Sequence, residues 1–174
     1  MDAGLTIPLA TLVLLVALAL AFDFMNGFHD AANSIATVVS TGVLRPHYAV
    51  AWAAFFNFVA IFIFHLKVAA TVGKGIVDPG AIDHYVIFGA LIGAIIWNLI
   101  TWYYGIPSSS SHALIGGMIG ATIAKAGVDP LVMKGIVRTV SFIFISPVLG
   151  MLLGGLIMVA VSWVCLRSAP RKVD

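Results

Sequence analysis

Long apolar segments dominate the chain, and short polar stretches interrupt them. The apolar runs lack the period-two alternation of strands, and most reach the roughly 20 residues that a helix needs to cross a bilayer. They predict four helices, at residues 5–43, 48–66, 84–104 and 139–166, the last of them kinked or broken near Pro147. The apolar run at 113–124 is too short to cross alone, so residues 107–126 are predicted to form a re-entrant hairpin segment.

Composition agrees with a membrane protein. Of the 174 residues, 61% are hydrophobic and 9% are charged, and the mean hydropathy is +1.11. The expected fold is therefore all-α, with four to five transmembrane helices in one domain that spans residues 1–174. A scattered net charge of +2 does not favour nucleic acid, and a single cysteine, Cys165, excludes an internal disulfide.

A polar stripe follows the first apolar run. On a helix its members lie three or four residues apart on one face: Asp23, Asn26, Asp30, Asn33, Thr37 and Thr41. Ionisable groups at membrane depth are costly, so the stripe predicts a functional site. Gly27 is the expected break in this helix, where backbone amides would face a ligand. The alternatives are a soluble amphipathic helix, or polar groups that only join helices together.

A second polar stretch opens the short apolar run. Pro107 precedes four serines and a histidine, namely Ser108, Ser109, Ser110, Ser111 and His112. Hydroxyls at a helix N-terminus, together with free backbone amides and the positive end of the helix dipole, favour an anion. Ordinary N-capping is the alternative, although it requires only one serine.

The two stretches suggest complementary chemistry. Carboxylates and amides suit a cation or proton, and we assign this role to Asp23, Asn26, His29 and Asp30. The serine stretch suits an anion. We therefore expect segments 26–34 and 107–112 to share one cavity, as the broken helices of secondary transporters do. The predicted function is cation- or proton-coupled anion transport.

Two motifs carry a resemblance to a known family. GFHDAANSIATVVSTGVLRP (27–46) and PSSSSHALIGGMIGA (107–121) resemble the two hallmarks of the inorganic phosphate transporter (PiT) family, and WNLITWYYGIP (97–107) is similar as well. The resemblance extends from about residue 12 to residue 166. It implies symport of inorganic phosphate with sodium ions or protons, or transport as a neutral metal–phosphate complex.

The resemblance also implies roles for individual residues. Asp30 would couple the cation or proton, and it would meet the ion if sodium is used; no other metal ligand is assigned. The phosphate contacts would be Asn33, Ser34, Ser108, Ser109, Ser110, Ser111 and His112. No cofactor is expected beyond the coupling ion and a divalent metal carried together with phosphate.

The chain departs from the family pattern in two ways. Many members have asparagine where His29 stands; the GFHD form is similar to the bacterial low-affinity branch and favours protons over sodium. The family's second Asp/Asn signature is absent, so we expect one half of an inverted-repeat transporter that works with a second half or as a homo-oligomer. The expected location is the bacterial inner membrane, with several spans in the bilayer.

Two other functions compete with transport. One is a structural membrane subunit whose polar stripe binds only a partner chain. The other is an intramembrane serine hydrolase that uses Ser109 or Ser110, His112 and Asp30. No G-x-S-x-G elbow is present, so we expect the chain not to be an enzyme.

Overall fold

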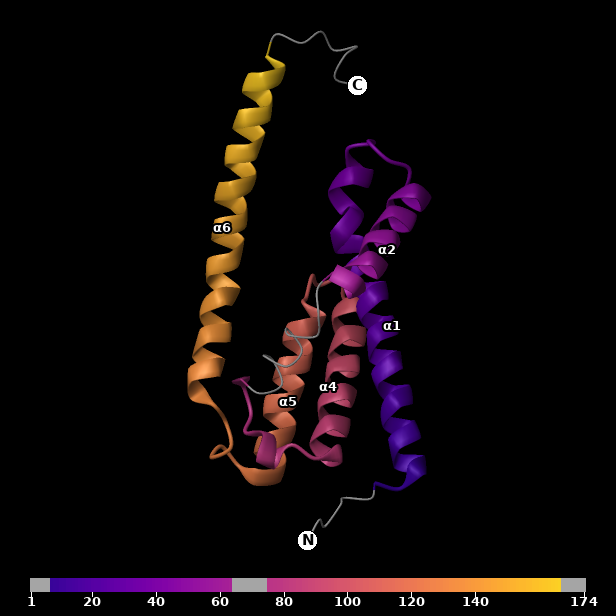
Figure 1. Ribbon diagram of the computed structural model, residues 1–174, viewed down its shortest axis with the longest axis vertical. Helices are drawn as coiled ribbons and strands as arrows, with labels where there is room; N and C mark the ends of the chain where they lie inside the picture. Colours follow the sequence, from indigo (N-terminus) through magenta and orange to yellow (C-terminus); the bar gives the residue numbers. More distant parts are fainter. Residues whose placement is uncertain (1–6, 64–74, 167–174) are drawn as a thin grey trace. The chain divides into compact units, whose positions relative to one another are not determined.

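The computed structural model describes residues 7–63 and 75–166, and these are largely helical (Figure 1). The elements are α1 (Leu9–Ser40), α2 (Pro46–Ile63), the 3₁₀ turn η1 (Pro79–Ala81), α4 (His84–Tyr103), α5 (Ser110–Ala126) and α6 (Met133–Cys165). As predicted, four of these helices, α1, α2, α4 and α6, are long and apolar enough to cross a membrane. The predicted helical residues 5–6 and 64–66, and loop residues 67–74, lie outside the described part.

The first helix does not break at Gly27. α1 runs as one helix of 32 residues from Leu9 to Ser40, so the predicted broken helix is wrong here. A glycine inside a helix costs only about 1 kcal/mol relative to alanine, which the hydrogen bonds of the surrounding turns offset. The helix ends where Thr41 and Gly42 turn the chain, and Pro46 then occupies the first position of α2, where its missing N–H is harmless.

The chain divides into two compact units, residues 1–132 and 133–174. The second unit contains α6, which runs unbroken for 33 residues and begins before the predicted start at residue 139. The break expected near Pro147 is absent. Transmembrane helices tolerate an internal proline because neighbouring groups can satisfy the freed carbonyl.

In the first unit, α1 packs on α4, and α4 packs on α5 (Figure 1). The core is small: Phe22 of α1 lies against Leu91 and Ala94 of α4, with Ala113 and Leu114 of α5 beside them. Most large apolar side chains are exposed instead. This distribution is expected in a bilayer, where lipid is as apolar as leucine and small residues bring helices together.

Helices α4 and α5 form an antiparallel hairpin. A β-carbon added at Gly117 would lie 2.5 Å from the backbone oxygen of Ala90, so the two backbones touch there. At the end of the hairpin where α4 begins and α5 ends, the Lys125 ammonium lies 2.8 Å from the carboxylate of Asp83, the residue that caps α4. This ion pair, with a hydrogen bond from the Val86 amide, holds the pKa of Asp83 below its usual range.

Replacing Gly117 with alanine is expected to destabilise the hairpin by about 1–3 kcal/mol, because the new methyl group would overlap a backbone carbonyl that cannot rotate away. Thermal melting of the detergent-solubilised protein measures the effect. Gly116 is the matched control, since a β-carbon there meets nothing within 4 Å. Equal melting temperatures for Gly117→Ala and Gly116→Ala would contradict the close packing.

Candidate functional site

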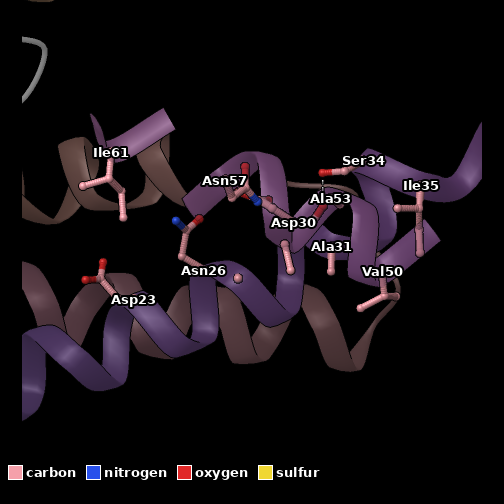
Figure 2. Close-up of a pocket in the computed structure, with 12 residues that line it drawn as sticks. Asp23, Asn26, Asp30, Ala31, Ser34, Ile35, Val50, Ala53, Asn57 and Ile61 are labelled. Atoms are coloured by element: carbon pink, nitrogen blue, oxygen red, sulfur yellow. Dashed lines mark hydrogen bonds between the residues drawn. The ribbon is translucent and has the colours of Figure 1, made fainter. Parts of the chain in front are cut away.

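A cleft of about 810 Å³ lies between α1 and α2 (Figure 2). Four predicted residues line it from α1: Asp23, Asn26, Asp30 and Ser34. Asn57 faces them from α2, and apolar residues such as Ala53 complete the wall. Three members of the predicted polar stripe, Asp23, Asn26 and Asp30, therefore face this cavity, whereas Asn33, Thr37 and Thr41 do not line it. Asn57, which lies within the apolar span of α2, lines the same cleft.

The cleft has the electrostatic character of a cation site. Its lining contains two carboxylates and no lysine, arginine or histidine. The side chain of Asp30 is 42% exposed. The Ser34 hydroxyl donates a hydrogen bond of 3.0 Å to the backbone oxygen of Asp30, as the dashed line in Figure 2 shows. Oxygen atoms dominate the polar groups here, and such groups suit sodium ions or protons.

His29 turns away from this cleft and joins α1 to α4. Its Nε2 atom lies 3.2 Å from the hydroxyl oxygen of Thr101, and only 8% of the residue is exposed. Its Nδ1 atom lies 3.8 Å from a carboxylate oxygen of Asp30. His29 thus lies between the α1–α2 cleft and a second cavity of about 180 Å³, which it lines with Asn33, Thr101 and the turn through Pro107.

The serine stretch opens α5 and has its own cavity. Ser108, His112 and Trp97 line a space of about 410 Å³ between α4 and α5. The indole N–H of Trp97 donates a hydrogen bond of 3.2 Å to the Ser108 hydroxyl. Ser109 is the N-cap and accepts from the His112 amide, which confirms a capping role for one serine. Ser111 is exposed, whereas Ser110 is fully buried.

The predicted cavity shared by segments 26–34 and 107–112 is found only in part among the described residues. Asp30 lines the α1–α2 cleft, whereas Ser108 and His112 line the α4–α5 cavity. The 180 Å³ cavity brings the two segments together only through His29, Asn33 and Pro107. The cause is helical phase: successive residues of α1 point about 100° apart, so Asn33 and Ser34 face different neighbours.

A buried polar layer lies where α1, α4 and α5 meet. Gly93 contacts Gly117, and the Trp97 indole N–H donates a hydrogen bond to Ser108. In this antiparallel pair of helices, Asn98 of α4 and Ser110 of α5 therefore lie at a similar height along the helix axes. Four buried atoms of this layer have no hydrogen-bond partner among the described residues: His29 Nδ1, Asn98 Oδ1 and Nδ2, and Ser110 Oγ. Leaving a buried polar group without a partner costs about 1–3 kcal/mol.

The sequence gives only a weak indication of this layer. Asn98 and Thr101 form a small polar patch one turn apart, and Trp97 is the first residue of the motif WNLITWYYGIP. Polar residues within an apolar span, at three- or four-residue spacing, were the available signal. Within residues 7–63 and 75–166, no three His, Cys, Asp or Glu side chains gather as a metal site.

Comparison with known proteins identifies the family. A model described as "Phosphate transporter family" matches residues 26–173, which include the serine stretch and every member of the polar stripe except Asp23. The chain belongs to the phosphate transporter family. It is therefore an integral, multi-pass membrane protein, and its bacterial relatives, among them the low-affinity inorganic phosphate transporter PitB of Escherichia coli (strain K12), indicate the inner membrane.

Comparison with individual members of the family shows what share of their length the chain covers. It is 58% identical over 174 residues to a probable low-affinity inorganic phosphate transporter of Rhizobium meliloti (strain 1021), covering 100% of this chain and 52% of that protein. Its identity to a protein of the same description from Streptomyces halstedii is 45%, covering 95% and 78%. The chain thus spans about half the length of the Rhizobium relative.

A solved structure supports the fold. The chain is similar to a structure described as "The sodium-dependent phosphate transporter", with a TM-score of 0.85 and 30% sequence identity. The match covers 94% of this chain and 42% of that one. The prediction of an all-helical fold that forms one half of such a transporter is therefore confirmed.

Proposed function

We propose that this chain forms one half of a secondary transporter that carries inorganic phosphate across the membrane together with a cation. The observation that carries the proposal is the carboxylate-lined cleft between α1 and α2, found in a chain of the phosphate transporter family. The relatives compared above are named as phosphate transporters, which supports phosphate as the substrate.

The cleft supports the cation half of the proposal. Asp23 and Asp30 face the space together with amide oxygens, and no basic side chain lines it. A carboxylate in a membrane is expensive to keep ionised, so binding a cation or proton there is favourable. We assign cation coupling to Asp23, Asn26 and Asp30, and proton coupling to His29 beside Asp30.

The start of α5 supports the phosphate half. Hydroxyls of Ser108 to Ser111, the His112 ring and the free amides of the first helical turn offer donors to an anion. Asn33 and Ser34 of α1 are proposed as further contacts. Because these groups line separate cavities here, we propose that phosphate binding brings segments 26–34 and 107–112 closer together.

Coupling follows from charge compensation. A phosphate anion in the membrane interior is costly, and a cation bound nearby offsets its charge, so each ligand favours the binding of the other. The coupling ion is a proton or sodium. A divalent metal bound to phosphate is the third candidate, because it compensates the phosphate charge in the same way. A second transporter half, or a second copy of the chain, completes the inverted-repeat arrangement.

Uptake of radiolabelled phosphate tests the proposal, in cells that lack other phosphate transporters and express the protein from its complete gene. We expect uptake to be abolished when the driving gradient is collapsed: a protonophore identifies proton coupling, and replacement of sodium by potassium identifies sodium coupling. A rate of uptake that both treatments leave unchanged would contradict coupled transport.

The rival functions predict other results. A purely structural subunit predicts no uptake and no shift in melting temperature when phosphate is added to the purified protein. A serine hydrolase requires its triad to meet, yet Asp30 lines the α1–α2 cleft while His112 lines the α4–α5 cavity. We therefore propose that the chain is not an enzyme, and labelling of Ser109 or Ser110 by a fluorophosphonate would contradict this.

A further inference from the structure

The contact between His29 and Thr101 lies at the centre of the buried polar layer and joins α1 to α4. Both residues are buried: the exposed fraction is 8% for His29 and 1% for Thr101. The two atoms in contact, His29 Nε2 and Thr101 Oγ1, are 3.2 Å apart. A neutral histidine can donate or accept at this nitrogen, so the direction of the bond decides which ring nitrogen carries the proton.

The hydrogen bonds of Thr101 set that direction. A hydroxyl has one hydrogen, and the Thr101 oxygen lies 3.0 Å from the backbone oxygen of Trp97 and 3.1 Å from that of Asn98. Carbonyl oxygens can only accept, so the hydroxyl donates its hydrogen within α4. With the hydroxyl donating within α4, Thr101 offers His29 a lone pair, and the ring donates from Nε2.

This assignment leaves the other ring nitrogen without a hydrogen. Nδ1 of His29 is buried, has no hydrogen-bond partner, and lies 3.8 Å from Asp30 Oδ1, which is too long for a hydrogen bond. A lone pair therefore faces a carboxylate oxygen. Two acceptors side by side repel each other unless a hydrogen-bond donor or a proton joins them.

We propose that Thr101 is a positioning residue that holds His29 as the Nε2–H tautomer. His29 Nδ1 and Asp30 Oδ1 then form a pair of acceptors for one hydrogen-bond donor, such as a water molecule, that arrives from the α1–α2 cleft. The effect on transport rests on the proposed function, whereas the tautomer does not.

Nitrogen NMR of the purified full-length protein, labelled with ¹⁵N-histidine and reconstituted in lipid, tests the tautomer directly. The chain has five histidines, and His29→Gln identifies the His29 signals by their loss. We expect a protonated Nε2 and an unprotonated Nδ1. Thr101→Ser should keep this pattern because serine retains the hydroxyl, and Thr101→Val should lose it. A protonated Nδ1 in the unaltered protein would overturn the proposal.

Thr122 provides a matched control. It is a fully buried threonine of α5 whose hydroxyl donates 2.8 Å to the backbone oxygen of Met118, so Thr122→Val removes the same kind of helix bond. We expect Thr122→Val to leave the His29 signals unchanged. A change as large as that of Thr101→Val would mean that general loss of packing, and not the contact with His29, controls the tautomer.

Phosphate uptake tests the consequence for transport. We expect Thr101→Val to lower the maximal rate about tenfold, the cost of one lost hydrogen bond, with Thr101→Ser close to the unaltered protein. Equal rates for Thr101→Val and Thr101→Ser would overturn the positioning role. If the unaltered protein carries no phosphate, the proposed function fails, while the NMR result still decides the tautomer.

Discussion

Replacing Asp30 with asparagine is expected to reduce phosphate uptake to background. Asparagine keeps the size of the side chain and its acceptor oxygen but removes the negative charge that faces the α1–α2 cleft. A bound cation loses its charge partner in this variant, and a hundredfold loss of cation binding corresponds to about 3 kcal/mol. The initial rate of radiolabelled phosphate uptake measures the effect.

Two controls separate coupling from folding. Membrane insertion of Asp30→Asn should be unchanged or improved, because an uncharged amide is less costly in the bilayer than a carboxylate. Asp129, an exposed carboxylate between α5 and α6, provides the matched variant Asp129→Asn, which should transport normally. Normal uptake by Asp30→Asn would show that another group couples the cation.

Replacing Ser110 with alanine is expected to raise the phosphate concentration needed for half-maximal uptake about tenfold. Ser110 is fully buried at the first position of α5, and its hydroxyl has no hydrogen-bond partner among the described residues. If phosphate supplies that partner, the hydroxyl contributes only in the bound state. The variant should then bind phosphate less well, yet melt no earlier than the unaltered protein in the absence of phosphate.

The melting temperature distinguishes a phosphate-binding role of Ser110 from a structural one. A structural serine would lower the melting temperature when replaced and leave the affinity for phosphate unchanged, which is the opposite result. Ser141 is the matched control, because its hydroxyl donates 2.8 Å to the Val137 backbone oxygen on the exposed surface of α6. Ser141→Ala should change neither quantity.

Much of the molecule could be predicted from local properties of the sequence. Helix α4 begins at His84, as predicted, because Asp83 caps it, and it ends within one residue of the prediction, where Tyr104 and Gly105 turn the chain. The two errors at helix level, at Gly27 and Pro147, have one cause. Both residues lower the stability of a helix, but neither forces a break when the flanking turns are strongly apolar.

The structure groups the predicted polar residues differently from the sequence-based expectation. Asp23, Asn26, Asp30 and Ser34 do face one cleft, but His29 and Asn33 face another cavity, and Asn57 joins the first from a different helix. Sequence spacing defines the faces of a single helix. It does not say which neighbour covers each face, because that depends on how separate helices pack.

The sequence by itself determined the class of protein, the number of long helices, the family and the two polar stretches, because hydrophobicity and motif spacing are properties of the chain read in one dimension. The tertiary structure decided which of those residues share a cavity, that His29 meets Thr101 of another helix, and which serine of α5 is buried. These properties depend on contacts between helices far apart in sequence, and only packing brings such contacts about.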